Sequence, residues 1–404
     1  MGDHRRNYVL KFKWLLLSTV ISLFLITEVS DTPRPPEGEI RRFFKVETFF
    51  RGSDQEVEVY RLFGREEGPT VLIFAGIHGD ESGGHLAADR YIGLRLEKGN
   101  LIIVPRLNLY AILTGKRTGL SGRDMNRKFH SSDENRDPDD KVVSLAKSLM
   151  DEADVILNLH QGHGCYFPSW IDRNRNPVRW GQCKVIDISI FDLPDGRRLE
   201  LERVAREVAR KANATIEDKR YHFHVNNTDT LSQRSVHREQ RQSLTFFALA
   251  RKHKMAFGIE ATKSCPLPQS ISYLTMAVNA MLERTGIEAA AFPSASPVEI
   301  EKDLRRNEAF SGLRVRINGV EKLVSPKSEI LLAPGDRFQV LSVEAEHTRG
   351  WYPSVSRSPF YNGMGKTFSV SRGDQLILHK YGKKVAVFPF SVKETNSPQI
   401  ETSI

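Results

Sequence analysis

The stretch that decides the fold class is TVLIFAGIHGDES, residues 70–82. Its first six residues, 70–75, form an apolar, β-branched run that predicts a strand. A polar turn with Gly76 and Gly79 on either side of His78 follows at once. In open α/β sheets the ligand sites lie beyond the carboxyl ends of the strands, and this turn occupies that position. The stretch therefore predicts an α/β fold with functional side chains at one edge of its sheet.

Three further apolar runs follow at residues 101–105, 155–159 and 255–259. Helical segments separate them; in residues 199–212, for example, apolar side chains recur on one face with arginines and glutamates opposite. Strands that alternate with helices indicate a sheet covered on its faces by helices. We expect a mixed, mostly parallel sheet flanked by helices, with a helix that begins at Asp137-Pro138.

The pattern changes after about Pro293. Short, often alternating runs are separated there by turn signals such as Asn318-Gly319 and Pro334-Gly335. Regular short strands with such turns predict a small all-β sandwich or barrel. The expected organisation is a signal anchor in residues 1–30, a linker in 31–40, the α/β domain in 41–293 and a β-rich accessory domain in 294–404.

The N-terminus has the pattern of an export signal. Four basic residues between positions 5 and 13 precede the apolar run 14–26, WLLLSTVISLFLI. That run is short for a bilayer, but a span over residues 9–29 is long enough, and the segment after it lacks an A-x-A cleavage site. We expect an uncleaved anchor in the inner membrane and a periplasmic remainder; a buried core helix is the alternative.

Composition excludes several other classes of protein. The chain has 404 residues, of which 40% are hydrophobic and 27% charged, as in ordinary globular proteins. Its net charge of +9 suits an anionic substrate or membrane surface, but no dense basic block predicts a nucleic-acid partner. Three cysteines without a CxxC pair exclude a disulfide scaffold and a cysteine-rich zinc site. Cys165 and Cys183 either pair or remain reduced thiols.

Residues that suit a catalytic zinc ion follow these predicted strands. His78 and Glu81 lie three residues apart on the glycine-flanked turn, and His160 comes directly after the run 155–159. Zinc accepts imidazole nitrogen and carboxylate oxygen, and three protein ligands with an open fourth position are typical of catalytic sites. Glu260, at the end of the run 255–259, is placed to act as general base without being a ligand.

The loop between the second and third runs carries basic and amide groups. In GRDMNRKF, residues 122–129, an arginine offers a planar fork for two carboxylate oxygens and Asn126 a further donor. Arg117, a little earlier in the chain, is suited to stabilise negative charge that develops on a carbonyl oxygen. For either arginine, an ordinary surface position is the alternative.

The four motifs HGDE, GRDMNRKF, LNLHQG and GIEATKS, in this order and each beside a predicted strand, resemble zinc metallocarboxypeptidases of the carboxypeptidase A-like superfamily. The resemblance covers roughly residues 41–290 and implies a zinc carboxypeptidase-like fold. It implies Zn²⁺ as the cofactor, with the following roles: His78, Glu81 and His160 as metal ligands, Glu260 as general base and acid, Asn126 and Arg127 as the grip on the substrate's terminal carboxylate, and Arg117 at the oxyanion.

The export signal and the trailing β-domain are similar to those of bacterial envelope DL-carboxypeptidases that determine cell shape. This narrower resemblance implies a peptidoglycan peptide as substrate, with terminal diaminopimelate removed from a tripeptide to leave a dipeptide. Some of those enzymes carry two β-domains, whereas about 110 residues here suffice for only one.

Two alternatives remain open at this stage. A zinc deacylase of the succinylglutamate desuccinylase or aspartoacylase type has much of the same motif order, although export counts against a cytosolic metabolite as substrate. A non-catalytic envelope scaffold with a degenerate zinc site is the other. The complete ligand set together with Glu260 argues against it.

Overall fold

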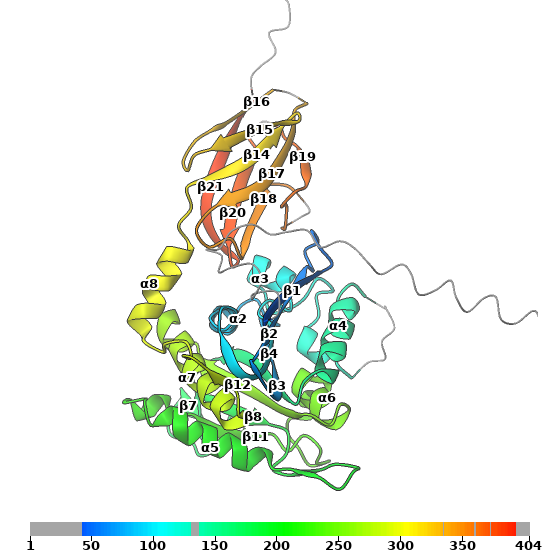
Figure 1. The fold of residues 1–404 in the computed structure, drawn as a ribbon, viewed down its shortest axis with the longest axis vertical. Coiled ribbons are helices and arrows are strands. Elements are labelled where there is room, and N and C mark those ends of the chain that lie inside the picture. The colour runs from blue at the N-terminus through cyan, green and yellow to red at the C-terminus, as the bar shows by residue number, and fades with distance from the viewer. Residues whose placement is uncertain (1–42, 131–136, 334, 359–360, 372, 393–404) are drawn as a thin grey trace, which may run out of the picture. The chain divides into compact units, whose positions relative to one another are not determined.

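The structure, a computed structural model, describes residues 43–130, 137–333, 335–358, 361–371 and 373–392 (Figure 1). The signal anchor and the linker predicted in residues 1–40 lie outside these ranges. Within them, no helix has both the length and the apolar character that a membrane crossing requires.

A central mixed sheet organises residues 44–289. In the described part of the chain its strand order is β1-β2-β4-β3-β5-β12-β8-β11, and β13 pairs with β4 outside that order. The bounds are β1 Phe44–Phe49, β2 Val57–Phe63, β3 Glu66–Ala75, β4 Leu96–Val104, β5 Val155–Gly162, β8 Cys183–Ile186, β11 His224–Asn227, β12 Met255–Thr262 and β13 Glu288–Ala289. The four neighbours β4, β3, β5 and β12 are parallel, and they contain the four predicted runs. The mostly parallel sheet is thus confirmed.

Helices cover both faces of the sheet, as Figure 1 shows. Alternate residues of β3 enter two different cores: Val71 and Ile73 lie in one, and Leu72 and Phe74 in the other. The first core is closed by α2 (Ser82–Asp89), α5 (Leu201–Asn213) and α7 (Leu267–Thr285); the second is closed by α4 (Asp140–Asp151) and α6 (Leu244–Ala250). Because residues 71–75 of β3 are buried on both faces, their sequence is continuously apolar instead of alternating.

Two boundaries differ from the sequence-based expectation. β5 and β12 continue through Gly162 and Thr262, so His160 and Glu260 lie within strands and face each other in the parallel ladder. Helix α4 begins at Asp140, three residues after Asp137. The carboxylate of Asp139 accepts hydrogen bonds from the backbone of residues 120 and 121 and does not cap its own helix.

Short elements fill the connections and carry much of the site. They are α3 (Leu109–Thr114), the 3₁₀ turns η1 (Met125–Arg127), η2 (Lys219–Tyr221) and η3 (Arg238–Gln242), and the two-residue strands β6 (Cys165–Tyr166), β7 (Arg175–Asn176), β9 (Phe191–Asp192) and β10 (Arg198–Leu199). Strand β6 pairs with β7, and β9 pairs with β10. All three cysteines are unpaired, two of them buried.

Residues 312–392 form two four-stranded sheets around one apolar core, as expected for a β-rich C-terminal region. The first sheet has the order β15-β14-β17-β19 and the second β16-β21-β20-β18. The bounds are β14 Gly312–Ile317, β15 Val320–Val324, β16 Ile330–Leu332, β17 Arg337–Glu344, β18 Trp351–Val355, β19 Thr367–Ser369, β20 Gln375–Lys380 and β21 Lys383–Val392. Helix α8 (Pro297–Asn307) precedes them and has Ser296 as its N-cap.

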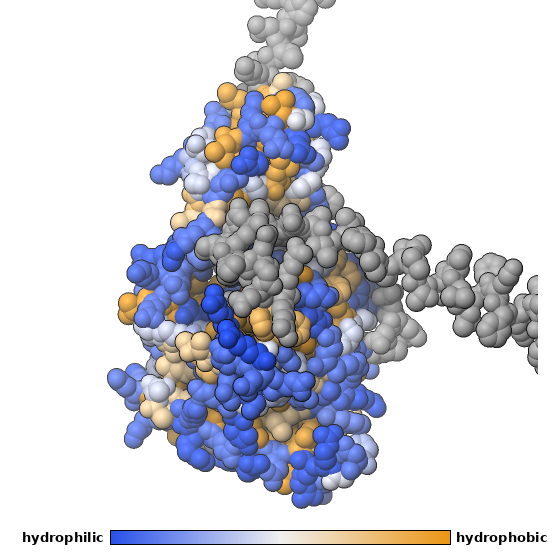
Figure 2. All heavy atoms as spheres, in the orientation of Figure 1, coloured by the Kyte–Doolittle hydropathy of each residue, from blue (hydrophilic) through white to orange (hydrophobic). Residues whose placement is uncertain are grey.

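The short runs of the sequence after residue 293, at 313–317, 329–332, 337–343, 367–370, 375–379 and 384–388, coincide with six of these strands, whereas β15 and β18 have no such run. β18 contains Pro353, which a sheet tolerates because β18 is an edge strand. β15 is almost wholly exposed and lacks a buried face, so its sequence carries no alternation. Its exposed Val320 and Leu323 lie in the part of the molecule where Figure 2 shows hydrophobic residues at the surface.

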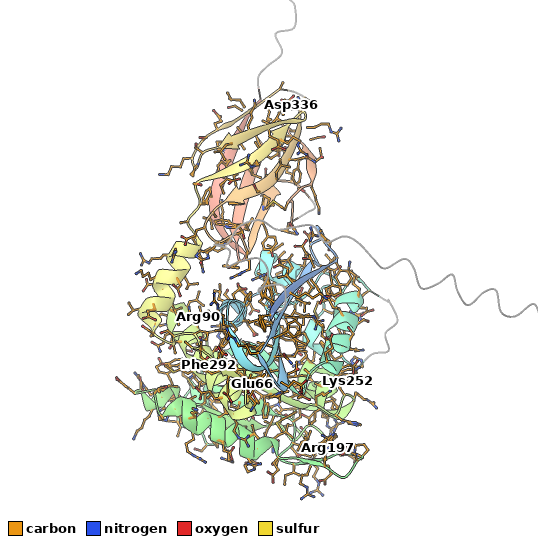
Figure 3. All side chains as sticks on the ribbon, viewed as in Figure 1. Glu66, Arg90, Arg197, Lys252, Phe292 and Asp336 are labelled. Atoms are coloured by element: carbon orange, nitrogen blue, oxygen red, sulfur yellow. The ribbon has the colours of Figure 1, made fainter. Side chains whose placement is uncertain are left out.

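The β20–β21 turn packs against α2 and α3. Arg106 is buried, donates to Asp89 at the end of α2, and lies 5.5 Å from the centre of the Tyr381 ring. Helix α8 is fixed to α2 as well, because Arg90, labelled in Figure 3, donates to Asp303. Helix α2, which begins directly after the predicted metal ligand Glu81, therefore also contacts the C-terminal strands.

Candidate metal centre

The turn between β3 and α2 is held tightly against α3. Gly76 has φ +66°, a left-handed conformation that favours glycine, and a Cβ atom on Gly79 would overlap the backbone of Ala111. The amide of Gly79 donates to the carbonyl of Lys116 over 2.8 Å. Two glycines thus allow the backbone to place His78 and Glu81 directly beyond the end of β3.

His78, Glu81 and His160 converge on one point. The Nδ1 atom of His78 lies 2.8 Å from Oε1 of Glu81, and Nδ1 of His160 lies 2.8 Å from its Oε2. All three side chains are buried, and their ligand atoms lie within 4.8 Å of one another. Within the ranges that the structure describes, no other group of histidine, cysteine and carboxylate side chains meets that criterion. Two imidazole nitrogens and one carboxylate fit a divalent cation such as zinc.

A second carboxylate, Asp124, orients the first histidine. Its Oδ1 lies 2.9 Å from Nε2 of His78, the ring nitrogen that faces away from Glu81. Burial disfavours the charged His78 ring, but Glu81 and Asp124 outweigh that effect and raise its pKa. Burial also opposes the charge of Asp124, yet its hydrogen bond to His78 keeps the pKa of Asp124 well below the usual range. Asp124 was not predicted to be a site residue, although it lies inside the GRDMNRKF motif.

Arg117 lies beside the ligand set. Its guanidinium donates to Oε1 of Glu81 and to Oδ2 of Asp124, each over 3.1 Å. About half of its side chain is exposed (48%), so it also faces the cavity described below. The predicted oxyanion residue is therefore adjacent to the ligands, where it forms ion pairs with two carboxylates.

Asn126 and Arg127 lie on η1, next to the start of α6. The Oδ1 atom of Asn126 accepts a hydrogen bond from the amide of Leu244, which leaves the Asn126 amide NH₂ for the cavity. Arg127 is anchored through one Nη atom, which donates to the carbonyl of Asn126. Burial lowers the pKa of Arg127, and the charge of Asp124 opposes that effect. Together they present the donors that a substrate carboxylate needs.

Glu260 lies beside the candidate ligands and is not part of the group that could hold a metal ion. It lies opposite His160 in the ladder between β5 and β12. Its burial, and then the negative charge of Glu81, raise its pKa well above the ordinary value. The next charged residue along the chain, Lys263, is paired with Asp80 over 2.8 Å. A carboxyl group with a raised pKa and a position near the ligands suits general acid–base chemistry.

One cavity of about 490 Å³ connects these groups. It is lined by all of the site residues predicted from sequence: His78, Glu81, Arg117, Asn126, Arg127, His160 and Glu260. Further lining residues, which the sequence analysis did not single out, come from the segment around Trp180 and from η3 with Glu239 and Gln240. No local motif marks these residues, since only the folded chain brings them to the cavity.

A mostly parallel α/β sheet thus carries a His/Glu/His set, which could hold a metal ion, and a donor-lined cavity at its carboxyl edge. The chain belongs to the Peptidase_M99 family, described as carboxypeptidase controlling helical cell shape, catalytic. The model of that family matches residues 53–297, which is more than half of the chain.

Solved structures with the same fold include the cell shape determinant protein Csd4 from Helicobacter pylori. Its apo form has a TM-score of 0.57 and 20% sequence identity, and the match covers 83% of this chain and all of that one. The tripeptide-bound form gives the same values. The mDAP-bound form, described as a D,L-carboxypeptidase, has a TM-score of 0.55 and 20% identity, with 81% of this chain and 97% of that one covered.

A curated relative of another type matches a shorter segment. The N-alpha-acetyl-L-2,4-diaminobutyric acid deacetylase of Halomonas elongata is 38% identical over 107 residues, or 24% of this chain. The matched segment spans only about 30% of the length of that relative.

Proposed function

We propose that this protein is a zinc-dependent carboxypeptidase that trims peptidoglycan stem peptides. Its reaction would remove terminal diaminopimelate from a tripeptide and leave a dipeptide, and it would thereby influence cell shape. The observation that carries the proposal is that the candidate metal ligands His78, Glu81 and His160 line one cavity together with Glu260, Asn126 and Arg127. A site that grips a free carboxylate beside a metal centre is suited to cleave the last peptide bond of a chain.

In the proposed reaction, each residue of the site has a separate role. A zinc ion bound by His78, Glu81 and His160 would act as a Lewis acid on the carbonyl and lower the pKa of water. Glu260 takes the proton of the attacking water and passes it to the leaving amine. Arg117 stabilises the negative charge on the former carbonyl oxygen.

The substrate class draws support from the family and its relatives. The Helicobacter pylori protein with this fold has been solved with a tripeptide and with mDAP. The family description names control of helical cell shape, which depends on peptidoglycan. Export also agrees with such a substrate, because residues 1–30 have the pattern of a signal anchor and peptidoglycan lies outside the inner membrane. We therefore place the catalytic domain in the periplasm, and a topology reporter fused after residue 392 tests that placement.

A deacylase is the second candidate, favoured by the 38% identity with the Halomonas elongata deacetylase over 107 residues. An N-acylated amino acid also presents a free carboxylate next to an amide bond. The two functions differ in what lies on the acyl side of that bond, a peptide in one case and an acetyl group in the other.

One experiment separates the two candidates. The full-length chain, purified in detergent and loaded with zinc, is incubated with muramyl tripeptide and with N-acetyl-diaminobutyrate, and the products are identified by mass spectrometry. The proposal predicts release of diaminopimelate from the tripeptide. Hydrolysis of the acetylated amino acid with an intact tripeptide would favour the deacylase, and hydrolysis of neither would reject both.

A further inference from the structure

The charges that line the active-site cavity are mostly paired with one another. Asp80 pairs with Lys263, and Glu81 lies between two histidines and Arg117. Of the lining acids, Glu260 has the role of general base. That leaves Glu239, whose position is not explained by the chemistry of bond cleavage.

Glu239 is held close to the carboxylate-binding pair. It lies on η3, which packs against η1, the element that carries Asn126 and Arg127. Two hydrogen bonds hold these segments together. The amide of Phe129, just after η1, donates to the carbonyl of Gln242, and the amide of Leu244, just after η3, donates to the side-chain Oδ1 of Asn126. The negative charge of Glu239 acts on Arg127, where it partly opposes the effect of burial on the pKa of the guanidinium.

The carboxylate of Glu239 is available to a ligand. About half of its side chain is exposed (47%). The nearest basic side chain in the described chain is that of His237, whose Nδ1 lies 3.6 Å from Oε1 of Glu239, longer than a normal hydrogen bond. His237 is itself packed edge-on against Trp180 on the wall of the cavity. Glu239 therefore presents an unneutralised carboxylate at the rim of the pocket.

The carboxylate of Glu239 should lower the affinity for substrates that carry no compensating positive charge. The substrate's own terminal carboxylate must approach Arg127, and the negative charge of Glu239 nearby repels it. The repulsion is offset only if the last residue of the substrate carries a positive charge that Glu239 attracts. Its α-amino group is consumed in the scissile amide, so that charge has to lie on the side chain.

We infer that Glu239 is a specificity-determining residue, which binds the side-chain ammonium group of the substrate's C-terminal residue. The inference rests on the proposed carboxypeptidase function and assigns a contact within it. The pocket then recognises the released residue at two points: its carboxylate at Asn126 and Arg127, and its distal ammonium group at Glu239. Residues that carry only a carboxylate or an alkyl chain at that end are disfavoured.

Two peptides that differ only in the distal amino group test the contact between Glu239 and that group. Muramyl tripeptide ending in diaminopimelate is compared with the same peptide ending in 2-aminopimelate, which lacks only the distal amino group. The zinc-loaded full-length chain should cleave the first with a kcat/KM about tenfold higher, as expected for a hydrogen bond to a charged group. Glu239→Gln should bring the two values of kcat/KM within about threefold of each other. It should lower cleavage of the diaminopimelate peptide, and it should not lower cleavage of the 2-aminopimelate peptide, because the repulsion of the terminal carboxylate is removed.

The control is Asp229→Asn, the same acid-to-amide change at an exposed residue of the preceding loop that does not line the cavity. It should keep the tenfold preference, and a thermal melt together with zinc content verifies that each variant is folded. A wild-type protein without the preference, or a Glu239→Gln variant that retains it, would overturn the inference and leave the carboxypeptidase function standing. Failure of the wild type to cleave either peptide would instead reject the proposed function.

Discussion

Asp124 and His78 are joined through the histidine Nε2 atom, which lies 2.9 Å from Oδ1 of the aspartate. A carboxylate at Nε2 requires the ring proton there, so the lone pair is left at Nδ1, the atom that lies 2.8 Å from Glu81. Such a carboxylate–histidine pair orients a metal ligand and raises its basicity. The centre thus has a supporting residue on a different segment from its ligands.

Loss of the Asp124 charge should weaken metal binding without unfolding the protein. For Asp124→Asn we expect zinc affinity to fall by about 10- to 100-fold, the usual effect of removing a carboxylate that supports a ligand. Competition with a zinc-chelating dye measures the affinity. Asp151→Asn, on the exposed end of α4, serves as the matched control and should bind zinc as the wild type does. An unchanged affinity in Asp124→Asn would show that the contact does not support the centre.

The proposed binding of the substrate's terminal carboxylate by Arg127 leads to a prediction about substrates with and without that group. Arg127→Ala should lower kcat/KM for a tripeptide with a free terminal carboxylate by about 100-fold, since a charge-assisted pair is lost. For the same peptide with an amidated C-terminus, which has no carboxylate to bind, the variant and the wild type should be equally slow. Steady-state rates on the two peptides test this, and an equal loss on both would contradict the assigned role.

The turn that carries the ligands should not tolerate a side chain at Gly79. A Cβ atom there would overlap the backbone of Ala111, so either the turn or α3 must move. Gly79→Ala should therefore destabilise the protein by about 1–3 kcal/mol and reduce zinc binding. Gly93→Ala, where a Cβ would meet open space, is the control and should change neither thermal unfolding nor zinc affinity.

A buried lysine predicts how stability depends on pH. Lys184 is fully buried over the ring of Phe223, and its ammonium group has no hydrogen-bond partner among the described residues. Burial lowers its pKa from 10.5 to about 7. Between these values the unfolded chain binds more protons than the folded one, so this residue makes the protein more stable as pH rises from 7 to 10.5.

Lys184→Met should remove that dependence. We expect it to stabilise the fold by roughly 3–5 kcal/mol at pH 7 and by progressively less towards pH 10. Urea unfolding at the two pH values measures the difference, with the exposed Lys219→Met as the control. An equal effect at both pH values would mean that Lys184 remains charged in the folded protein.

The core strands of the sheet and the convergence of the candidate ligands His78, Glu81 and His160 could be predicted, because both depend on local sequence. The run at residues 70–75 is apolar on both faces because β3 is covered on both, and the HGDE turn follows it directly. Asp124 and Glu239 were not singled out, since their roles depend on which segments the tertiary structure brings together. The helix start at Asp137 was predicted too early: Oδ1 of Asp137 accepts from the amide of Asp139 and pairs with Lys128, and the helix begins only at Asp140.

Zinc content measured beside tripeptide hydrolysis, in the wild type and two variants, tests the account most directly. The wild type should bind one zinc ion per chain and release diaminopimelate, and His160→Ala should do neither. Glu260→Ala should keep its zinc and lose about 100- to 10,000-fold in turnover, as when a general base is removed. A Glu260→Ala variant as active as the wild type, or a wild type that cleaves the tripeptide after its metal is removed, would contradict the account.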